Sequence, residues 1–330
     1  MKDIKLSALD LAIVPQGGNT LTAIERTVKL AQHIEQAGYE RLWLAEHHNM
    51  PNIASSATSV LIGHVAGKTK TLRIGSGGIM LPNHSPLQIA EQFGTLEALY
   101  PNRIDLGLGR APGTDQITAY ALRKNNMRYE YDFAANIAEL QQFFYNTDEY
   151  AKVRAFPGEG ANVPIWILGS STDSAYLAAE LGLPYAFAAH FAPAHLSAAM
   201  HIYQNNFKPS EFLDKPYSMA CVNAIAADTD EEATHLSTSV YQLFIGIITN
   251  NRRPLQPPVD SLDYLWNEPV KAAVEQMTAC SFIGSKNTIR KELSSFIQEL
   301  NLNEVMISGN VFDADARNKS YSLIKEAMEE

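Results

Sequence analysis

An arginine beside a glycine-rich segment is the first feature of this sequence that could bind a ligand. The segment RIDLGLGRAPG, residues 103–113, alternates apolar residues with glycines at 107 and 109, and Arg110 stands where the strand-like pattern ends. Alternate glycines leave one side of a strand bare, so a flat ligand could lie against the backbone while the guanidinium binds an anionic group. A buried strand with tight packing and a surface arginine fits the same pattern.

A second segment, LGSSTDS at residues 168–174, has the composition of an anion site. Gly169, Ser170, Ser171 and Ser174 lie between an apolar run and a helical pattern. Unpaired backbone N–H groups at a helix start favour an anion, and the hydroxyls add donors. Serines at this position are also ordinary N-caps. If the strands before the two segments are neighbours, the guanidinium and the helix start could hold one phosphate, which favours the ligand-binding interpretation.

The sequence Glu46-His47-His48 could carry acid–base chemistry. Successive strand residues point to opposite sides, so the two histidines would not share a metal ion, and no HExxH spacing supplies further ligands. We therefore expect no metal here. A histidine titrates near neutral pH, which suits one imidazole to general acid or base work. A structural histidine held by Glu46 is the alternative.

Weaker candidates follow the ends of other apolar runs. Asp10, His84 and His190 could each take part in a site or simply line a pocket. Gly77 and Gly78 end a strand-like run, where a β-bulge or turn is the ordinary interpretation. The sharper hypothesis is a non-proline cis peptide bond beneath a ligand.

The elements that must position these residues alternate regularly between strand and helix. Eight strands, each followed by helical material, imply a parallel sheet with right-handed crossovers, and the count of eight favours a closed α/β (β/α)₈ TIM barrel. We expect a single barrel domain over residues 1–330, with an irregular insertion at about 246–275 before the last strand. The expected strands lie at residues 4–14, 41–49, 72–82, 103–110, 164–171, 184–191, 217–227 and 304–310. The expected helices lie at residues 23–36, 54–67, 86–99, 133–145, 174–181, 193–206, 230–244, 287–300 and 315–328.

The candidate polar residues all follow strand ends. In a (β/α)₈ barrel the chemistry sits at the carboxyl ends of the strands. No similar polar cluster is expected at the opposite ends. This asymmetry predicts an active site on the carboxyl-terminal face.

Composition excludes several classes of partner. The formal charge of −10 argues against nucleic acid and anionic membranes, which would be repelled. Two cysteines in 330 residues form no disulfide framework. The sequence shows neither a signal peptide nor an apolar run approaching 18 residues, so we expect a cytoplasmic protein that spans no membrane.

Several motifs in one order resemble those of the bacterial luciferase-like flavin monooxygenases, most closely the branch that makes no light. The resemblance implies a barrel that binds FMN, which a separate flavin reductase delivers in reduced form. It also implies dioxygen and a small organic molecule as substrates, and a homodimer, whose contact we place at residues 54–67 and 86–99. The motifs are AEHHN (45–49), GSGGIMLPNHSP (75–86), AEQFGTLEALYPNRIDLGLGRAPG (90–113), LGSS (168–171), FIGS (282–285) and EVMISG (304–309).

The resemblance also implies roles for individual residues. His47, supported by Glu46, matches the histidine that acts as catalytic base in luciferase. Arg110 matches the arginine that holds the flavin phosphate, and Ser170 matches the serine beside it. The glycine pair matches the residues that flank a cis peptide under the isoalloxazine ring. The remaining cofactor-binding candidates are Gly77, Gly78, Gly109, Gly169, Ser171 and Ser174.

The sequence departs from luciferase in two places. Gly109 stands where the light-emitting subunit carries a reactive cysteine, so we expect neither light nor a long-chain aldehyde substrate. Residues 247–275 share no motif with the family, and we expect them to shape the substrate pocket. Two alternatives stay open: a deazaflavin-dependent hydride-transfer oxidoreductase on the same barrel, and a flavin-binding protein without catalysis.

Overall fold

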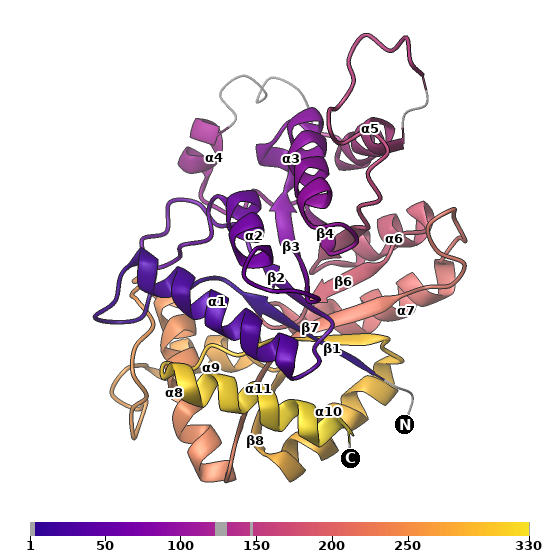
Figure 1. The fold of residues 1–330 in the computed structure, drawn as a ribbon. Coiled ribbons are helices and arrows are strands. Elements are labelled where there is room, and N and C mark those ends of the chain that lie inside the picture. The colour runs from indigo at the N-terminus through magenta and orange to yellow at the C-terminus, as the bar shows by residue number, and fades with distance from the viewer. Residues whose placement is uncertain (1–3, 123–130, 146–147, 330) are drawn as a thin grey trace.

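The strands of the computed structural model form a closed parallel barrel (Figure 1). The structure describes residues 4–122, 131–145 and 148–329. Eight strands close in the order β1-β2-β3-β4-β5-β6-β7-β9, because β6 pairs with β7 and β9 pairs with β1. The predicted TIM barrel is therefore confirmed. The strands are β1 (Lys5–Asp10), β2 (Arg41–Leu44), β3 (Arg73–Met80), β4 (Ile104–Gly109), β5 (Ile165–Gly169), β6 (Tyr185–Ala188), β7 (Ser218–Ala227), β8 (Ser281–Ser285) and β9 (Glu304–Ser308).

Strand β8 lies outside the barrel and was not predicted. Strand β7 has 10 residues, and its first half pairs with β9 while its second half, from Asn223 to Ala227, pairs with β8. The long strand thus extends beyond the barrel and offers an edge to β8.

The helices cover the outside of the barrel (Figure 1). Most follow the predicted ranges within a few residues, but α4 and α9 were not predicted. Helix α9 includes the last part of the insertion at about residues 246–275, which we expected to be irregular. Asn19 caps α1 by accepting from the Thr22 backbone N–H, which fixes where that helix begins. The helices are α1 (Thr20–Gln36), α2 (Thr58–Ala66), α3 (Pro86–Leu99), α4 (Gln116–Leu122), α5 (Phe133–Tyr145), α6 (Thr172–Leu181), α7 (Leu196–Asn206), α8 (Asp230–Ile248), α9 (Glu268–Met277), α10 (Lys286–Leu300) and α11 (Ala314–Glu329), with short 3₁₀ turns at Leu81–Asn83 and Pro193–His195.

Apolar side chains fill two layers. The larger core packs the outer face of the sheet against the helices, as expected when a parallel sheet is covered on that face. A smaller cluster fills the inside of the barrel. None of the described helices is long and apolar enough to cross a membrane. The inner cluster consists of Leu9, Trp43, Ala45, Trp166, Ala186, Met219, Cys221 and Met306.

The amino-terminal end of the barrel contains a buried charge network, which contradicts the expectation that polar residues gather only at the other end. Arg41 binds Asp105 at 2.7 Å and Glu304 at 2.8 Å. The Trp43 indole donates to Asp105, and the Tyr217 hydroxyl donates to Glu304. In the sequence each of these residues looks like a lone charge at a strand start. Only barrel closure brings β2, β4 and β9 together there.

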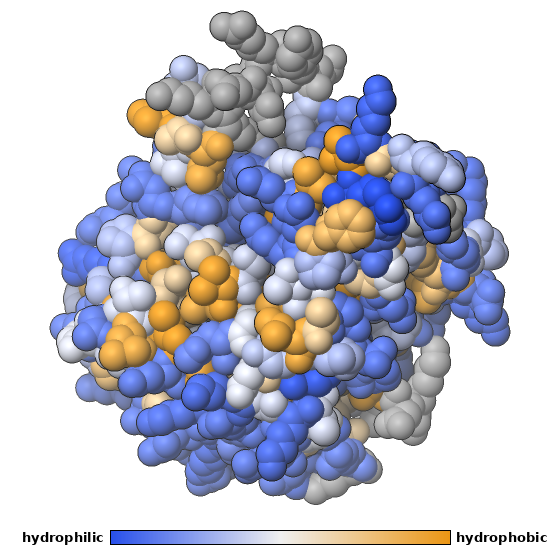
Figure 2. All heavy atoms as spheres, turned by 45° about the horizontal axis from the view of Figure 1, so that its top comes forward, coloured by the Kyte–Doolittle hydropathy of each residue, from blue (hydrophilic) through white to orange (hydrophobic). Residues whose placement is uncertain are grey.

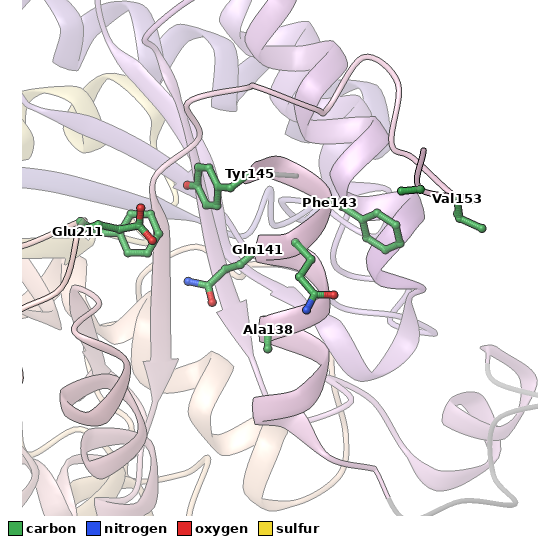
Figure 3. Close-up of a pocket in the computed structure, with 9 residues that line it drawn as sticks. Ala138, Gln141, Phe143, Tyr145, Val153 and Glu211 are labelled. Carbon is green, nitrogen blue, oxygen red and sulfur yellow. The ribbon is translucent and has the colours of Figure 1, made fainter. Parts of the chain in front are cut away.

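Two hollows, of about 600 and 450 Å³, lie toward this same amino-terminal end. Figure 3 shows the larger one, where Gln141 and Tyr145 of α5 face Glu211 from the segment before β7. The smaller hollow shares these residues and continues to Arg41 and Asp105. Neither hollow is lined by a residue that the sequence marked for chemistry.

Candidate active site

Glu46, just beyond β2, is the centre of a hydrogen-bond cluster at the carboxyl-terminal end of the barrel. Its carboxylate is 1% exposed and contacts the Nε2 atoms of His48 at 2.8 Å and His84 at 2.9 Å. The Met80 backbone N–H and the Asn83 amide donate to it as well. Burial alone would raise the pKa of Glu46, but these hydrogen bonds hold it below its ordinary value. Glu46 is thus a fully engaged anchor that holds His48 and His84 in place.

His47 is the histidine of this segment that Glu46 does not hold. Its Nδ1 lies 3.3 Å from the Gly113 carbonyl oxygen, which can only accept, so Nδ1 carries the hydrogen. Nε2 is then an acceptor, and no described residue donates to it. Burial lowers the pKa of His47 below its ordinary 6.5, so the ring is neutral at pH 7. A neutral imidazole with a free Nε2 is a competent general base.

The loop after β4 lies directly against this segment. Gly113 has a φ of +64°, and a Cβ there would fall 2.9 Å from the Glu46 carbonyl oxygen, so both conformation and space favour glycine. Asn83 donates to the Pro112 carbonyl at 2.8 Å and to the Glu46 carboxylate. The structure therefore brings together the arginine segment and the histidine segment that the sequence singled out separately.

Arg110 and the start of α6 face each other across neighbouring strands. Its guanidinium lies 3.6 Å from the carboxylate of Asp173 in the first turn of α6, and the two side chains are 60% and 70% exposed. Ser171 is the N-cap residue, but its side chain makes no capping hydrogen bond. Ser170, half-buried, precedes it at the end of β5. The guanidinium and an uncapped helix start thus flank one solvent-accessible position, which suits a phosphate.

Ser174 has a different environment from the serines before it. Its hydroxyl donates to the Ser171 carbonyl at 2.7 Å and contacts the Tyr185 hydroxyl at 2.9 Å. A Cβ at Gly169 would collide with this hydroxyl, so glycine there lets the turn between β5 and α6 close around Ser174. Ser174 therefore holds the turn together and joins it to Tyr185 of β6.

The Gly77–Gly78 peptide bond is cis, as hypothesised, and the register of β3 on β4 shifts at this point. A Cβ on Gly78 would fall 2.7 Å from the Gly107 carbonyl oxygen, and a Cβ on Gly77 would fall 2.9 Å from Leu9. These distances are too short for a side chain. At Gly78 the obstacle is backbone, so packing requires glycine there, whereas at Gly77 the nearest atom is the end of the flexible Leu9 side chain.

Gly109 is also explained by packing. A Cβ there would lie 2.8 Å from the Met80 sulfur, and the whole of β4 is buried. The structure thus shows residues 104–109 as a tightly packed strand that is followed by the exposed Arg110.

The weaker candidates separate into two groups. Asp10 is buried and accepts from the Thr27 hydroxyl at 2.7 Å and from Arg317 at 3.1 Å, so its charge is compensated within the scaffold. His190 differs, because its buried Nδ1 has no hydrogen-bond partner in the described ranges. Burial, with a smaller effect of the nearby His47, lowers the pKa of His190 to about 4. His190 is therefore a neutral imidazole at the wall of the site.

Sequence reasoning missed two groups near His47. Asn83 was overlooked because a single amide after a strand carries no pattern, although it lies within the motif at residues 75–86 that contains the glycine pair. Arg252 was overlooked because it lies in the insertion without motifs. The dipeptide Arg252-Arg253, with no acidic residue within five positions on either side, was the available signal.

Comparison with known proteins identifies the family. The model of the family described as luciferase-like monooxygenase matches residues 5–302. A protein of Escherichia coli (strain K12) named luciferase-like monooxygenase is 49% identical over 329 residues, covering 100% of this chain and 98% of the relative. The N-acetyl-S-alkylcysteine monooxygenase of Bacillus subtilis (strain 168) is 33% identical over 334 residues, covering 98% of each chain.

Solved structures share the fold over the whole chain. Apo-MsnO8 has a TM-score of 0.87 at 30% identity and covers 99% of this chain and 98% of its own. The oxygenating constituent of 3,6-diketocamphane monooxygenase from Pseudomonas putida, solved with FMN, has a TM-score of 0.74 at 16% identity and covers 98% and 97%. An F420-dependent secondary alcohol dehydrogenase, solved with an F420-acetone adduct, has a TM-score of 0.71 at 13% identity and covers 99% of each. The chain belongs to the luciferase-like monooxygenase family of oxidoreductases.

Proposed function

We propose that this protein is an FMN-dependent monooxygenase that uses reduced FMN and dioxygen to oxidise a small organic molecule. The observation that carries the proposal is the pairing of Arg110 with the uncapped start of α6, at the carboxyl-terminal end of the barrel, where the free Nε2 of His47 also lies. We call this end of the barrel the rim. One rim thus offers an anion site and a neutral base, which are the two protein functions that this chemistry needs.

The residues present fit the flavin phosphate. Arg110 is exposed enough to turn from Asp173 to a ligand, and the backbone N–H groups after Ser171 have no side-chain cap. Ser170 and Ser171 would add donors to the phosphate, while Gly77 and Gly78 would face the ring, as the family resemblance implies. Ser174 would act indirectly, by holding the turn.

His47 would manage the proton of the reaction. When bound, reduced FMN supplies two electrons, so that one atom of dioxygen enters the substrate and the other leaves as water. His47 Nε2 can accept a proton at pH 7 because the ring is neutral there. Glu46 holds Asn83, which in turn holds the loop that carries Gly113, so Glu46 acts as a positioning residue.

The cofactor is tested by titration. We expect wild-type protein to bind FMN more tightly than F420, and Arg110→Met to weaken FMN binding by about 10- to 100-fold, the range of one or two charge-assisted hydrogen bonds. Lys208→Met is the matched control, because Lys208, which follows α7, is an exposed cation that pairs with Glu180 of α6. It should leave FMN affinity unchanged. Tighter binding of F420 would instead support the deazaflavin enzyme.

Catalysis is tested separately from binding. The first substrates to try are N-acetyl-S-alkylcysteines, the class named for the Bacillus subtilis relative. Reduced FMN from a separate flavin reductase should support product formation that consumes dioxygen and depends on the substrate. Flavin binding without any such product across a broad substrate panel would point to a flavin-binding protein without catalysis.

We also propose a cytoplasmic homodimer. Both cysteines are free, as is usual in a reducing compartment. Helices α2 and α3 lie side by side (Figure 1) and expose Val60 and Leu99, which are 68% and 61% accessible. Figure 2 shows hydrophobic residues gathered in several patches on the face that it displays. Light scattering should give twice the chain mass, and Val60→Asp should reduce it to one chain mass.

A further inference from the structure

The insertion before α9 is fixed above the carboxyl-terminal end of the barrel by backbone hydrogen bonds. The Leu255 N–H donates to the Val14 carbonyl, and the Gln16 N–H donates to the Leu255 carbonyl, each at 2.8 Å. The Leu255 side chain is 3% exposed. The segment just before Leu255 is therefore held against the loop that follows β1, on the same end of the barrel as the candidate active site.

This anchoring places the Arg252 guanidinium beside the histidine segment. Its Nη1 atom lies 2.8 Å from the sulfur of Met50, three residues after His47. The charge is close enough to His47 to lower the pKa of that imidazole, after the larger effect of burial. Arg252 is thus a cation at the edge of the proposed oxidation site.

The protein leaves this cation uncompensated. Within the described ranges Arg252 forms no ion pair, and a thioether is only a weak hydrogen-bond acceptor. By contrast, Arg41 and Arg317 each bind buried carboxylates, and Arg110 faces Asp173. Arg252 is also solvent-exposed, so its guanidinium is available to an anionic ligand that enters the candidate active site.

We infer that Arg252 binds a carboxylate of the substrate, so that the enzyme oxidises small organic acids rather than neutral molecules. The inference rests on the proposed function and names the substrate class of the same site. A single planar guanidinium matches a carboxylate through two parallel hydrogen bonds. A phosphate is better served by the other anion site, where a helix start adds N–H donors to Arg110.

The test compares three proteins: wild type, Arg252→Met and Arg253→Met. Arg253 is the matched control, because it is the next residue, is also exposed and is named in no ion pair among the described residues. The probes are N-acetyl-S-benzylcysteine and 4-phenylbutanoate, each with its neutral methyl ester, and phenyl phosphate. Binding is measured by calorimetry on FMN-loaded protein, and kcat/KM is measured for any probe that is oxidised.

We expect wild type to bind at least one acid 10- to 100-fold more tightly than its ester. Arg252→Met should lose that preference, while Arg253→Met keeps it. The inference is overturned if wild type shows no preference for either acid, if Arg252→Met retains it, or if phenyl phosphate binds more tightly than both acids. FMN titration of the same samples separates the proposed function from the inference about Arg252. Failure to bind FMN would contradict the proposed function alone. The role of Arg252 would then still be tested by measuring acid binding to the flavin-free protein.

Discussion

The two ends of the barrel use the same kinds of side chain for opposite purposes. At the amino-terminal end, Arg41 is buried and its two nearest carboxylate partners, Asp105 and Glu304, are fully inaccessible. At the carboxyl-terminal end, Arg110 is 60% exposed and contacts its partner only at 3.6 Å. The first arginine is bound on all sides by the protein, whereas the second is available to a ligand.

The difference lies in how many partners the chain itself supplies. Asp105 is held ionised by Arg41 and Arg73, which outweigh the effect of burial on its pKa. At the other end, the Nε2 of His47 and the Nδ1 of His190 have no partner in the described part of the chain. Charged residues therefore mark a functional site here only where some of their hydrogen-bonding capacity is left unused.

Removing a member of the amino-terminal network should have the largest effect. Arg41→Met would leave the buried Glu304 without its arginine partner and Asp105 with Arg73 alone, and would lose the stacking of the guanidinium on Trp166 at 4.9 Å. We expect the free energy of unfolding to fall by about 3–5 kcal/mol, measured by urea denaturation. The folded fraction should bind FMN with unchanged affinity.

The control for that variant is an exposed ion pair. Lys319→Met removes a cation that pairs with Asp228 at the surface, so its cost should stay below about 1 kcal/mol. If Arg41→Met lowered the free energy of unfolding by no more than this, the amino-terminal network would stabilise the fold no more than an exposed ion pair does. The contrast between the two ends of the barrel would then be wrong.

His47→Ala should affect catalysis instead of stability. Loss of a general base lowers kcat/KM by about 10²- to 10⁴-fold. FMN affinity should stay within about twofold of wild type, because the proposed phosphate site consists of Arg110 and the start of α6 and does not include His47. The wild-type activity should begin to fall only below pH 6.5, since burial lowers the pKa of His47. His201→Ala, on the exposed face of α7, is the control, and equal activity in both variants would remove His47 from the mechanism.

His190, at the carboxyl-terminal end of the barrel, should lower the free energy of unfolding at acidic pH. Unfolded, it takes up a proton near pH 6.5, whereas in the folded protein its pKa is about 4. The unfolded state binds more protons between these values, so the folded state loses stability as pH falls from 6.5 to 4.

His190→Leu should remove this part of the pH dependence. The decline in unfolding free energy across that range should shrink by an amount on the order of 2–3 kcal/mol. Urea denaturation at four pH values measures the slope, which is independent of any overall change in stability from the substitution. An unchanged slope would mean that His190 is solvated rather than buried and unpaired.

The sequence allowed the barrel to be predicted, together with the proximity of Arg110 to the start of α6, because both depend on local patterns. Alternating apolar residues define β4, and a serine-rich strand-to-helix turn defines the start of α6. The charge network around Arg41 could not be predicted, because it joins β2, β4 and β9, which are distant in the sequence. The full set of partners of Glu46 could not be predicted for the same reason, since one of its histidine partners, His84, lies 38 residues away.

The smallest effect concerns Asp173, an acidic residue beside the proposed phosphate site. In the free protein Asp173 competes for the Arg110 guanidinium, and it would also repel the phosphate. Asp173→Asn keeps the size of the side chain and removes both effects, so FMN should bind about two- to fivefold more tightly, in keeping with the modest strength of an exposed ion pair. The gain should shrink between 20 mM and 500 mM salt because exposed charges are screened. Weaker binding would show that Asp173 positions the arginine rather than competing for it. At the amino-terminal end, removing one member of a charge pair lowers the stability of the fold. At the rim, removing the carboxylate that pairs with Arg110 is expected to raise the affinity for FMN, because there the arginine is meant to bind the ligand.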